Sequence, residues 1–158
     1  MSTIGFETHD HGACVDDAMA AAEARCAASD LRLTPIRRRV LELLLAEHRA
    51  LGAYDILGHL SAEGLGAQPP VAYRALDFLQ EQGLVHRIAS LNAFIGCPSP
   101  EHRHQGHFLI CLGCHVAIEL EESGISEAIA SAAAAHDFVA SSETVEVSGL
   151  CARCRAAA

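Results

Sequence analysis

Apolar residues recur at helical spacing through the first half of the chain and predict four helices there. An alanine-rich run without Gly or Pro over residues 15–28 predicts the first, because Ala has the highest helix propensity. Thr34 as N-cap and Pro35 in the first turn predict a second helix that extends to Glu47. Its apolar positions, spaced for one buried face, are Ile36, Val40, Leu41, Leu44 and Leu45.

The next segments predict two further helices and a hairpin. A short helix is expected over 53–61, ended by the glycine-containing turn at 63–66, and a fourth runs from Pro69-Pro70 to about Gln82, before Gly83. Residues 84–88 and 93–95 then read as two short strands joined by a turn at 90–92. Helices followed by such a hairpin predict a winged-helix domain over residues 1–96, whose last helix enters the major groove of DNA.

A composition change at residues 97–101, rich in Pro and Ser, predicts a hinge before a second domain at 102–158. Strands are expected at 107–111, 115–120 and within 138–150, with a helix at 123–135. The predicted class is therefore α+β. A unit of about sixty residues buries little apolar surface, so metal binding and dimerisation are its expected supports.

Four of the seven cysteines form two Cys-x-x-Cys knuckles, separated by 36 residues. They are Cys111, Cys114, Cys151 and Cys154. Two thiolates three positions apart can bind one cation from a tight turn, and two such pairs complete the closed tetrahedral shell of structural zinc. A pair of disulfides or free core thiols is the alternative. The paired spacing and the absence of a secretion signal favour metal.

Composition and charge limit the function classes. The chain has 158 residues, 51% of them hydrophobic, and no apolar run of the length that a membrane span requires. The N-terminal segment carries acids and histidines rather than a signal peptide, so a cytoplasmic location with reduced thiols is expected. The net charge of −9 argues at first against nucleic acid as a partner.

The distribution of charge changes that interpretation. Residues 1–30 carry six acids and one arginine, residues 31–96 carry six acids and seven arginines, and residues 97–158 carry eight acids and three arginines. The middle third is thus the segment suited to DNA, and every basic residue in it is Arg, which can grip phosphate or guanine bidentately. Four arginines lie within eight positions: Arg32, Arg37, Arg38 and Arg39. Taken alone, such a run is more typical of a solvated helix face.

A second group of potential ligands lies on both sides of the predicted hinge. His86 precedes it on the predicted hairpin, and Cys97 lies at the hinge itself. Three histidines follow, His102, His104 and His107, and Glu119 lies in the second domain. Mixed nitrogen, sulfur and oxygen ligands suit zinc better than magnesium, manganese or calcium. A cation that takes ligands from both sides would fix the angle between the domains. Judged by spacing alone, the alternative to a metal site is that these histidines lie on the surface and Cys97 is a core residue.

Five motifs in order resemble the Fur superfamily, most closely its zinc uptake regulator branch. They are LRLTPIR (31–37), AYDIL (53–57), PPVAYRALDFL (69–79), GLVHR (83–87) and CLGCHVAIE (111–119). The likeness spans about residues 17–154. It implies a homodimeric, zinc-dependent repressor that binds double-stranded operator DNA near zinc-uptake genes, with two zinc ions per chain, no membrane partner and no small-molecule substrate.

The resemblance also assigns residues. Structural zinc falls on the four knuckle cysteines, and the regulatory zinc falls on His86, Cys97, His104 and Glu119, with His102 as the alternative to His104. Tyr54 and Arg74 are implied to face DNA, and Tyr73 and Arg37 join them as candidates from the charge and helix pattern. The histidine run before the first knuckle departs from the superfamily, which puts a third metal site in doubt.

Two competing functions follow from the same residues. The first is a Fur-superfamily sensor of another metal or of peroxide. A peroxide or redox sensor would use a knuckle thiol or Cys97 as its reactive group, although metal-catalysed peroxide sensing needs an oxygen- and nitrogen-rich iron site, which a sulfur ligand does not suit. A zinc hydrolase would need an open coordination position and a general base. The chain has no His-Glu-x-x-His segment, and the four knuckle ligands form a closed set, so no enzyme is expected.

Overall fold

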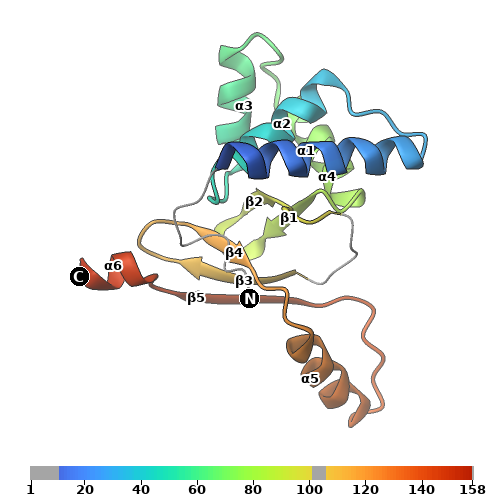
Figure 1. The fold of residues 1–158 in the computed structure, drawn as a ribbon, viewed down its shortest axis with the longest axis vertical. Coiled ribbons are helices and arrows are strands. Elements are labelled where there is room, and N and C mark those ends of the chain that lie inside the picture. The colour runs from blue at the N-terminus through green and yellow to red at the C-terminus, as the bar shows by residue number, and fades with distance from the viewer. Residues whose placement is uncertain (1–10, 101–105, 158) are drawn as a thin grey trace. The chain divides into compact units, whose positions relative to one another are not determined.

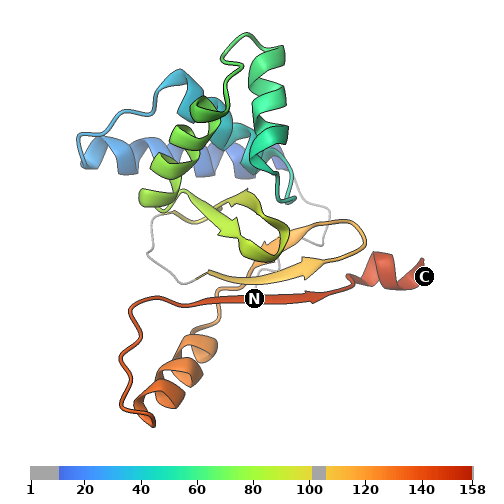
Figure 2. The same ribbon diagram turned by 180° about the vertical axis from the view of Figure 1, so that it is seen from behind.

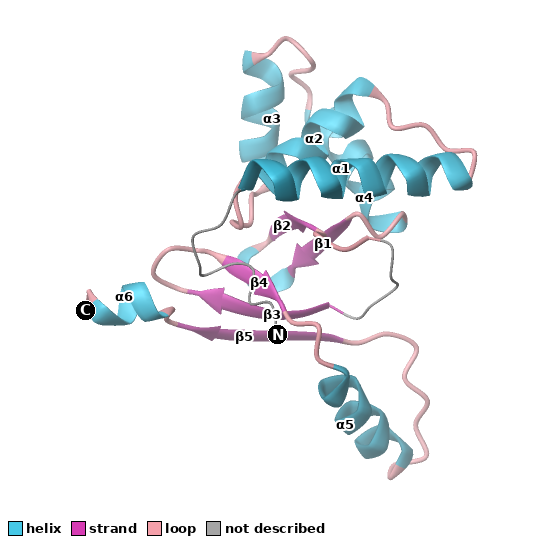
Figure 3. Ribbon diagram, viewed as in Figure 1, coloured by secondary structure: helices cyan, strands magenta, loops and turns pink. Residues whose placement is uncertain are grey.

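The structure is a computed structural model that describes residues 11–100 and 106–157, and it divides into two compact units, residues 1–103 and 104–158. Helices dominate the first unit, and a small sheet organises the second (Figure 3). The predicted α+β class is confirmed. No helix in the described parts of the chain is long and apolar enough to cross a membrane.

The described part of the first unit, residues 11–100, contains four α-helices and one hairpin (Figure 1). The elements, which match the predicted ones to within a few residues, are α1 (His11–Ala28), α2 (Pro35–Ala46), α3 (Ala53–Ala62), α4 (Pro69–Glu81), β1 (Val85–Ile88) and β2 (Ala93–Gly96). The largest difference is at α1, which begins at His11 rather than at residue 15. A 3-10 turn, Ala89–Leu91, joins the two strands.

Local chemistry fixes the helix ends. The Thr34 hydroxyl accepts a hydrogen bond from the Arg37 backbone N–H at 3.4 Å, and Pro35 occupies the first turn, where its missing N–H costs nothing. After the C-terminal end of α4, Gly83 has a φ of +68°, which glycine adopts without the strain that a side chain would cause. The Leu84 N–H then bonds the Leu79 carbonyl, and the chain turns into β1.

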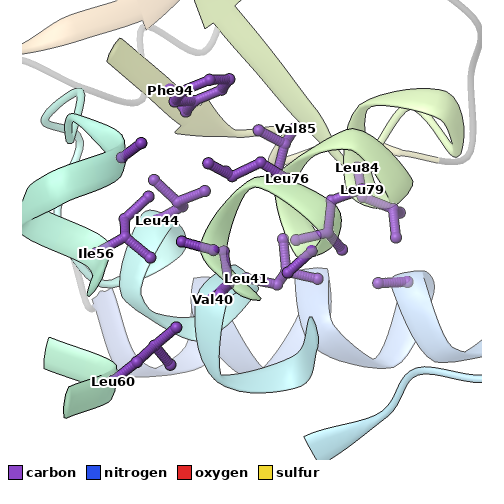
Figure 4. Close-up of a cluster of buried hydrophobic side chains, with 14 of the residues drawn as sticks. Val40, Leu41, Leu44, Ile56, Leu60, Leu76, Leu79, Leu84, Val85 and Phe94 are labelled. Atoms are coloured by element: carbon purple, nitrogen blue, oxygen red, sulfur yellow. The ribbon is translucent and has the colours of Figure 1, made fainter. Parts of the chain in front are cut away.

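The core of the first unit lies between α2, α3, α4 and the hairpin (Figure 4). Its members are apolar side chains that are almost fully buried, among them Val40, Leu41, Leu44, Ile56, Leu60, Leu76, Leu79, Leu84 and Val85. Cys26 on α1 is also buried and belongs to this core. Burying side chains of this size is the dominant stabilising term, and it orients α4 as part of a rigid body.

The hairpin is antiparallel, with His86 opposite Ile95 and Val85 opposite Gly96. Asn92 closes the turn with a φ of 46°, in the left-handed region that Asn tolerates. The Cys97 N–H bonds the Leu84 carbonyl at 2.9 Å, so Cys97 stays at the base of the hairpin. Leu51 adds an isolated bridge to Phe94, a pairing that the sequence pattern did not predict.

The second unit is a three-stranded sheet of order β4-β3-β5 with two helices (Figure 2). Its elements are β3 (Gly106–Cys111), β4 (Ala117–Glu119), α5 (Ser123–Ala134), β5 (Thr144–Gly149) and α6 (Ala152–Ala156). β3 pairs antiparallel with β4 and parallel with β5. Two expectations need correction: the strand region at 138–150 is regular only over β5, and α6 was not predicted.

Candidate metal centre and nucleic-acid interface

The two cysteine knuckles lie at the same end of the β3–β5 ladder. Cys111 is the last residue of β3 and pairs with Gly149, the last residue of β5. Cys114 follows in the turn after β3, and Cys151 is the N-cap of α6, which carries Cys154. Parallel pairing therefore brings together two knuckles that are far apart in the sequence.

The four sulfur atoms are spaced for one cation. All four Sγ atoms lie within 4.8 Å of one another, and the Cys114 and Cys151 sulfurs are 3.9 Å apart. Zn–S bonds of about 2.3 Å in a tetrahedron place sulfurs about 3.8 Å apart. The Cys151 backbone N–H also donates to the Cys111 sulfur at 3.3 Å. These residues fit a closed four-sulfur zinc site.

The electrostatics of this cluster differ from one thiol to the next. Backbone N–H groups, first that of Cys151, lower the pKa of Cys111 to about 6. The pKa of Cys154 is raised to about 12, first by its hydrogen bond with Cys151. At neutral pH one thiolate is therefore preformed, while another sulfur must lose its proton when a metal binds.

Gly113 makes the close approach of the knuckles possible. A Cβ at this position would lie 2.9 Å from the Cys154 sulfur and 3.0 Å from its Cβ, closer than packed atoms normally come. The glycine thus forms a cradle for a ligand sulfur. The sequence shows a glycine between Cys111 and Cys114, but its need for space becomes evident only from the fold.

His86 and Cys97 of the second predicted ligand group are neighbours within the first unit. A ring nitrogen of His86 and the Cys97 sulfur lie within 4.8 Å of each other, because adjacent ends of β1 and β2 carry them. Cys97 is 2% exposed. A buried thiol beside an imidazole can serve as two of the four ligands of a zinc ion.

The other predicted members of that group belong to the second unit or to its junction. Glu119 is the last residue of β4. His102 and His104 lie outside the described residues. His107 is described and has another role: its Nε2 lies 2.8 Å from a carboxylate oxygen of Glu143, a partner that the sequence pattern did not reveal.

The candidate DNA-facing residues come from the first turn of α3 and the second turn of α4. Tyr54 on α3 is 72% exposed, and Tyr73 on α4 is 44% exposed. Arg74 is exposed next to Tyr73, and the described residues include no acidic partner for its guanidinium. A free guanidinium near the start of α4 can reach phosphate or a base edge.

Most of the arginine run on α2 is engaged inside the unit. Arg38 bonds Glu23 of α1, and Arg39 bonds both carboxylate oxygens of Glu63 at 2.7 Å. Arg37 lies over the Phe78 ring, 3.5 Å from its centroid, and donates to the Arg32 carbonyl. These contacts hold α1, α3 and α4 around α2. The density of arginine in the sequence therefore overstates the charge that is free for DNA.

Known proteins resemble the chain over most of its length. The profile of the Ferric uptake regulator family matches residues 28–148. The zinc uptake regulation protein of Escherichia coli (strain K12) is 38% identical over 137 residues, which are 86% of this chain and 80% of that protein. A solved zinc uptake regulator complexed with zinc and DNA is 36% identical with a TM-score of 0.85, covering 90% of this chain and 96% of that one. The holo form of XcZur is 41% identical with a TM-score of 0.79, covering 87% and 96%.

Proposed function

Because the chain belongs to the Ferric uptake regulator family, whose members are metal-responsive DNA-binding regulators and not enzymes, we propose that it is a zinc-responsive repressor of zinc-uptake genes. The observation that carries this proposal is the pairing of a buried thiol, Cys97, with His86 in a chain 38% identical to a zinc uptake regulation protein. A thiolate ligand favours zinc over the harder cations.

The proposal assigns one zinc ion to structure. Cys111, Cys114, Cys151 and Cys154 would hold it in a closed shell, supported by the spacing of their sulfurs. Such a site leaves no position for a water or a substrate. It therefore stabilises the fold and performs no chemistry of its own.

A second zinc ion is the proposed signal. Its ligands would be His86 and Cys97 from the first unit and His104 and Glu119 from the second, with His102 as the alternative to His104. Ligands drawn from both units would restrict how the units move, because metal bonds are short and directional. The ion would then favour the arrangement that binds DNA, and a coupling of about 1–3 kcal/mol per site corresponds to a change of about 5- to 150-fold in affinity.

The DNA surface in this proposal is the first turn of α3 and the N-terminal half of α4. Tyr54, Tyr73 and Arg74 are exposed there, and Arg37 supports α4 from behind through its contact with Phe78. One unit presents one such helix, whereas an operator with two half-sites requires two.

Homodimerisation through the second unit would supply the second helix. Strand β5 is an edge of its sheet, α5 has no buried residue, and several large apolar side chains of this unit are exposed. They are Leu112, Phe138, Val139, Val147 and Leu150. An edge strand beside exposed apolar residues is typical of a surface that a partner covers.

Zinc content measured alongside DNA binding tests the proposal. We expect two zinc ions per chain, one of which mild chelation removes together with binding to the promoter DNA of a zinc-uptake gene. The variant Cys97→Ala should retain one ion and fail to bind that DNA at any zinc level. Cys14→Ser is the matched control, because Cys14 is a partly exposed cysteine outside both ligand sets.

The same preparations distinguish the alternatives. Sedimentation should give the mass of a dimer with and without the labile ion. One tightly held ion with zinc-independent DNA binding would reject the zinc switch and leave the structural site alone. DNA binding that responds to peroxide or to another metal instead would assign the protein to a different branch of the family.

A further inference from the structure

Three side chains of the second unit form a polar cluster that neither zinc site uses. His107 is the one polar or charged residue among the described positions that is fully buried, at 2% exposed. Its Nε2 lies 2.8 Å from Oε1 of Glu143, and the Ser126 hydroxyl donates to the same oxygen. A buried polar group without partners would be strongly unfavourable, so these bonds are integral to the fold.

The cluster joins three separate elements. His107 is the second residue of β3, Glu143 directly precedes β5, and Ser126 lies in the first turn of α5. The backbone of His107 also accepts the Leu120 N–H at 2.8 Å, just after β4. The side chains thus link β3, the start of β5 and α5, and the His107 backbone adds a bond to the residue that follows β4.

The carboxylate of Glu143 is the charged member of the cluster. The hydrogen bond from Ser126, and then those with His107, lower the pKa of Glu143, so it is ionised at neutral pH. An ionised carboxylate only accepts hydrogen bonds, and His107 Nε2 is therefore the donor. Hydrogen bonds to a charged acceptor are stronger than those between neutral groups.

The cluster lies at the opposite end of the β3–β5 ladder from the cysteine knuckles, so it can influence the register of that ladder. His107 pairs with Val145 near the start of the ladder, and Cys111 pairs with Gly149 at its end. A slip of one residue along a strand is about 3.3 Å. Metal–ligand distances tolerate only about 0.2 Å. Whatever sets the register of this ladder therefore decides whether the two knuckles can share one ion.

We propose that His107, Glu143 and Ser126 form a clasp that sets the β3–β5 register before any metal binds and so positions the two halves of the cysteine site. The effect of the clasp on metal binding rests on the proposed zinc at the four cysteines. The clasp itself does not depend on that zinc. His107 and Glu143 are positioning residues: they touch no metal and act through the ladder.

Three variants test the clasp. Glu143→Ala removes the hydrogen bonds with both His107 and Ser126. Ser126→Ala removes only the second of these bonds, and it replaces Glu143→Ala in the test if that variant folds poorly. Glu143→Gln retains an oxygen that can accept both bonds but lacks the charge, so it should rescue in part. Glu127→Ala is the matched control, because Glu127 is an exposed glutamate next to Ser126 that makes no hydrogen bond or ion pair among the described residues.

Two measurements apply to the full chain. In metal-depleted protein, amide hydrogen exchange of β5 should be about 10- to 100-fold faster in Glu143→Ala than in the wild type, the range expected for loss of a buried charge-assisted hydrogen bond. Exchange in α2 and α4 should not change. In zinc-loaded protein, transfer of zinc to a colorimetric chelator should accelerate by a similar factor in Glu143→Ala, and Glu143→Gln should fall between Glu143→Ala and the wild type.

Each result has a definite meaning. Equal exchange in Glu143→Ala and Glu127→Ala would overturn the clasp, as would acceleration of the same size throughout both units, which indicates a general loss of stability. If the wild type binds no zinc at the cysteines, the proposed function fails on that point. The exchange measurement in metal-depleted protein still decides the clasp.

Discussion

Gly113 is the residue whose side chain, or lack of one, most directly controls the cysteine site. A methyl group there would press on the Cys154 sulfur at 2.9 Å, and a sulfur bound to metal cannot move away without lengthening its bond. Overpacking in a tight site costs about 1–3 kcal/mol. The smallest possible substitution is therefore enough to perturb the metal site.

We predict that Gly113→Ala loses zinc to a chelator about 5- to 150-fold faster than the wild type, the range that corresponds to that overpacking cost. Gly149→Ala is a matched control beside the second knuckle, because a Cβ there meets nothing within 4 Å. Competition with a colorimetric chelator measures both variants. Identical zinc transfer in the two would show that the first knuckle has room to relax.

At the scale of elements, the sequence was most informative where one pattern determines one helix. The N-cap at Thr34, the prolines at 69 and 70 and Gly83 predicted the ends of α2 and α4, because capping depends on neighbours in the chain. The parallel pairing of β3 with β5 was not predictable, because hydrogen bonds between distant strands leave no local signal. α6 is only five residues long, too short for a periodic pattern.

The same difference between local and long-range interactions determines which parts of the candidate sites could be predicted from the sequence. The Cys-x-x-Cys knuckles carry their spacing in the sequence, whereas the partner of His107 lies 36 residues away at Glu143. The arginines of α2 could be counted from the sequence. Their ion pairs with Glu23 and Glu63 could not be predicted, because those acids lie on other helices or at their ends. Local chemistry could be predicted, and long-range pairing required the fold.

The exposed start of α4 leads to a prediction about DNA. Arg74→Ala should weaken operator binding about 5- to 150-fold, because one bidentate base contact is worth about 1–3 kcal/mol. Arg38→Ala removes the same charge from α2 but breaks an exposed ion pair with Glu23, and should change operator binding little. Fluorescence anisotropy with operator and unrelated DNA measures both. Equal losses for the two variants would mean that net charge, and not the position of Arg74, governs binding.

At the scale of the whole molecule, the two units differ in what stabilises them. The first has a core of interlocking apolar side chains from four helices and the hairpin. The second buries few side chains, among them Phe108, Ile110 and Ile118, and α5 buries none. For a small unit with so little buried surface, we expect a metal at the proposed four-cysteine site to contribute directly to folding through its binding free energy.

Acidification should therefore unfold the second unit first. The pKa of Cys111 is lowered from the ordinary thiol value of 9.0 to about 6, first by the Cys151 N–H. The stability that the thiolate gains from this contact is therefore full only above about pH 9, declines as the pH falls, and is lost below about pH 6. Below that point zinc must displace one more proton, and its apparent affinity falls more steeply with pH. Zinc content and amide exchange measured from pH 8 to pH 5 should show zinc loss and exposure of β3 and β5 while α2 and α4 stay protected. A chelator at pH 8 should reproduce the same pattern, because it removes the same ion by another route. Simultaneous unfolding of both units with zinc still bound would show instead that the second unit does not depend on its cysteine site.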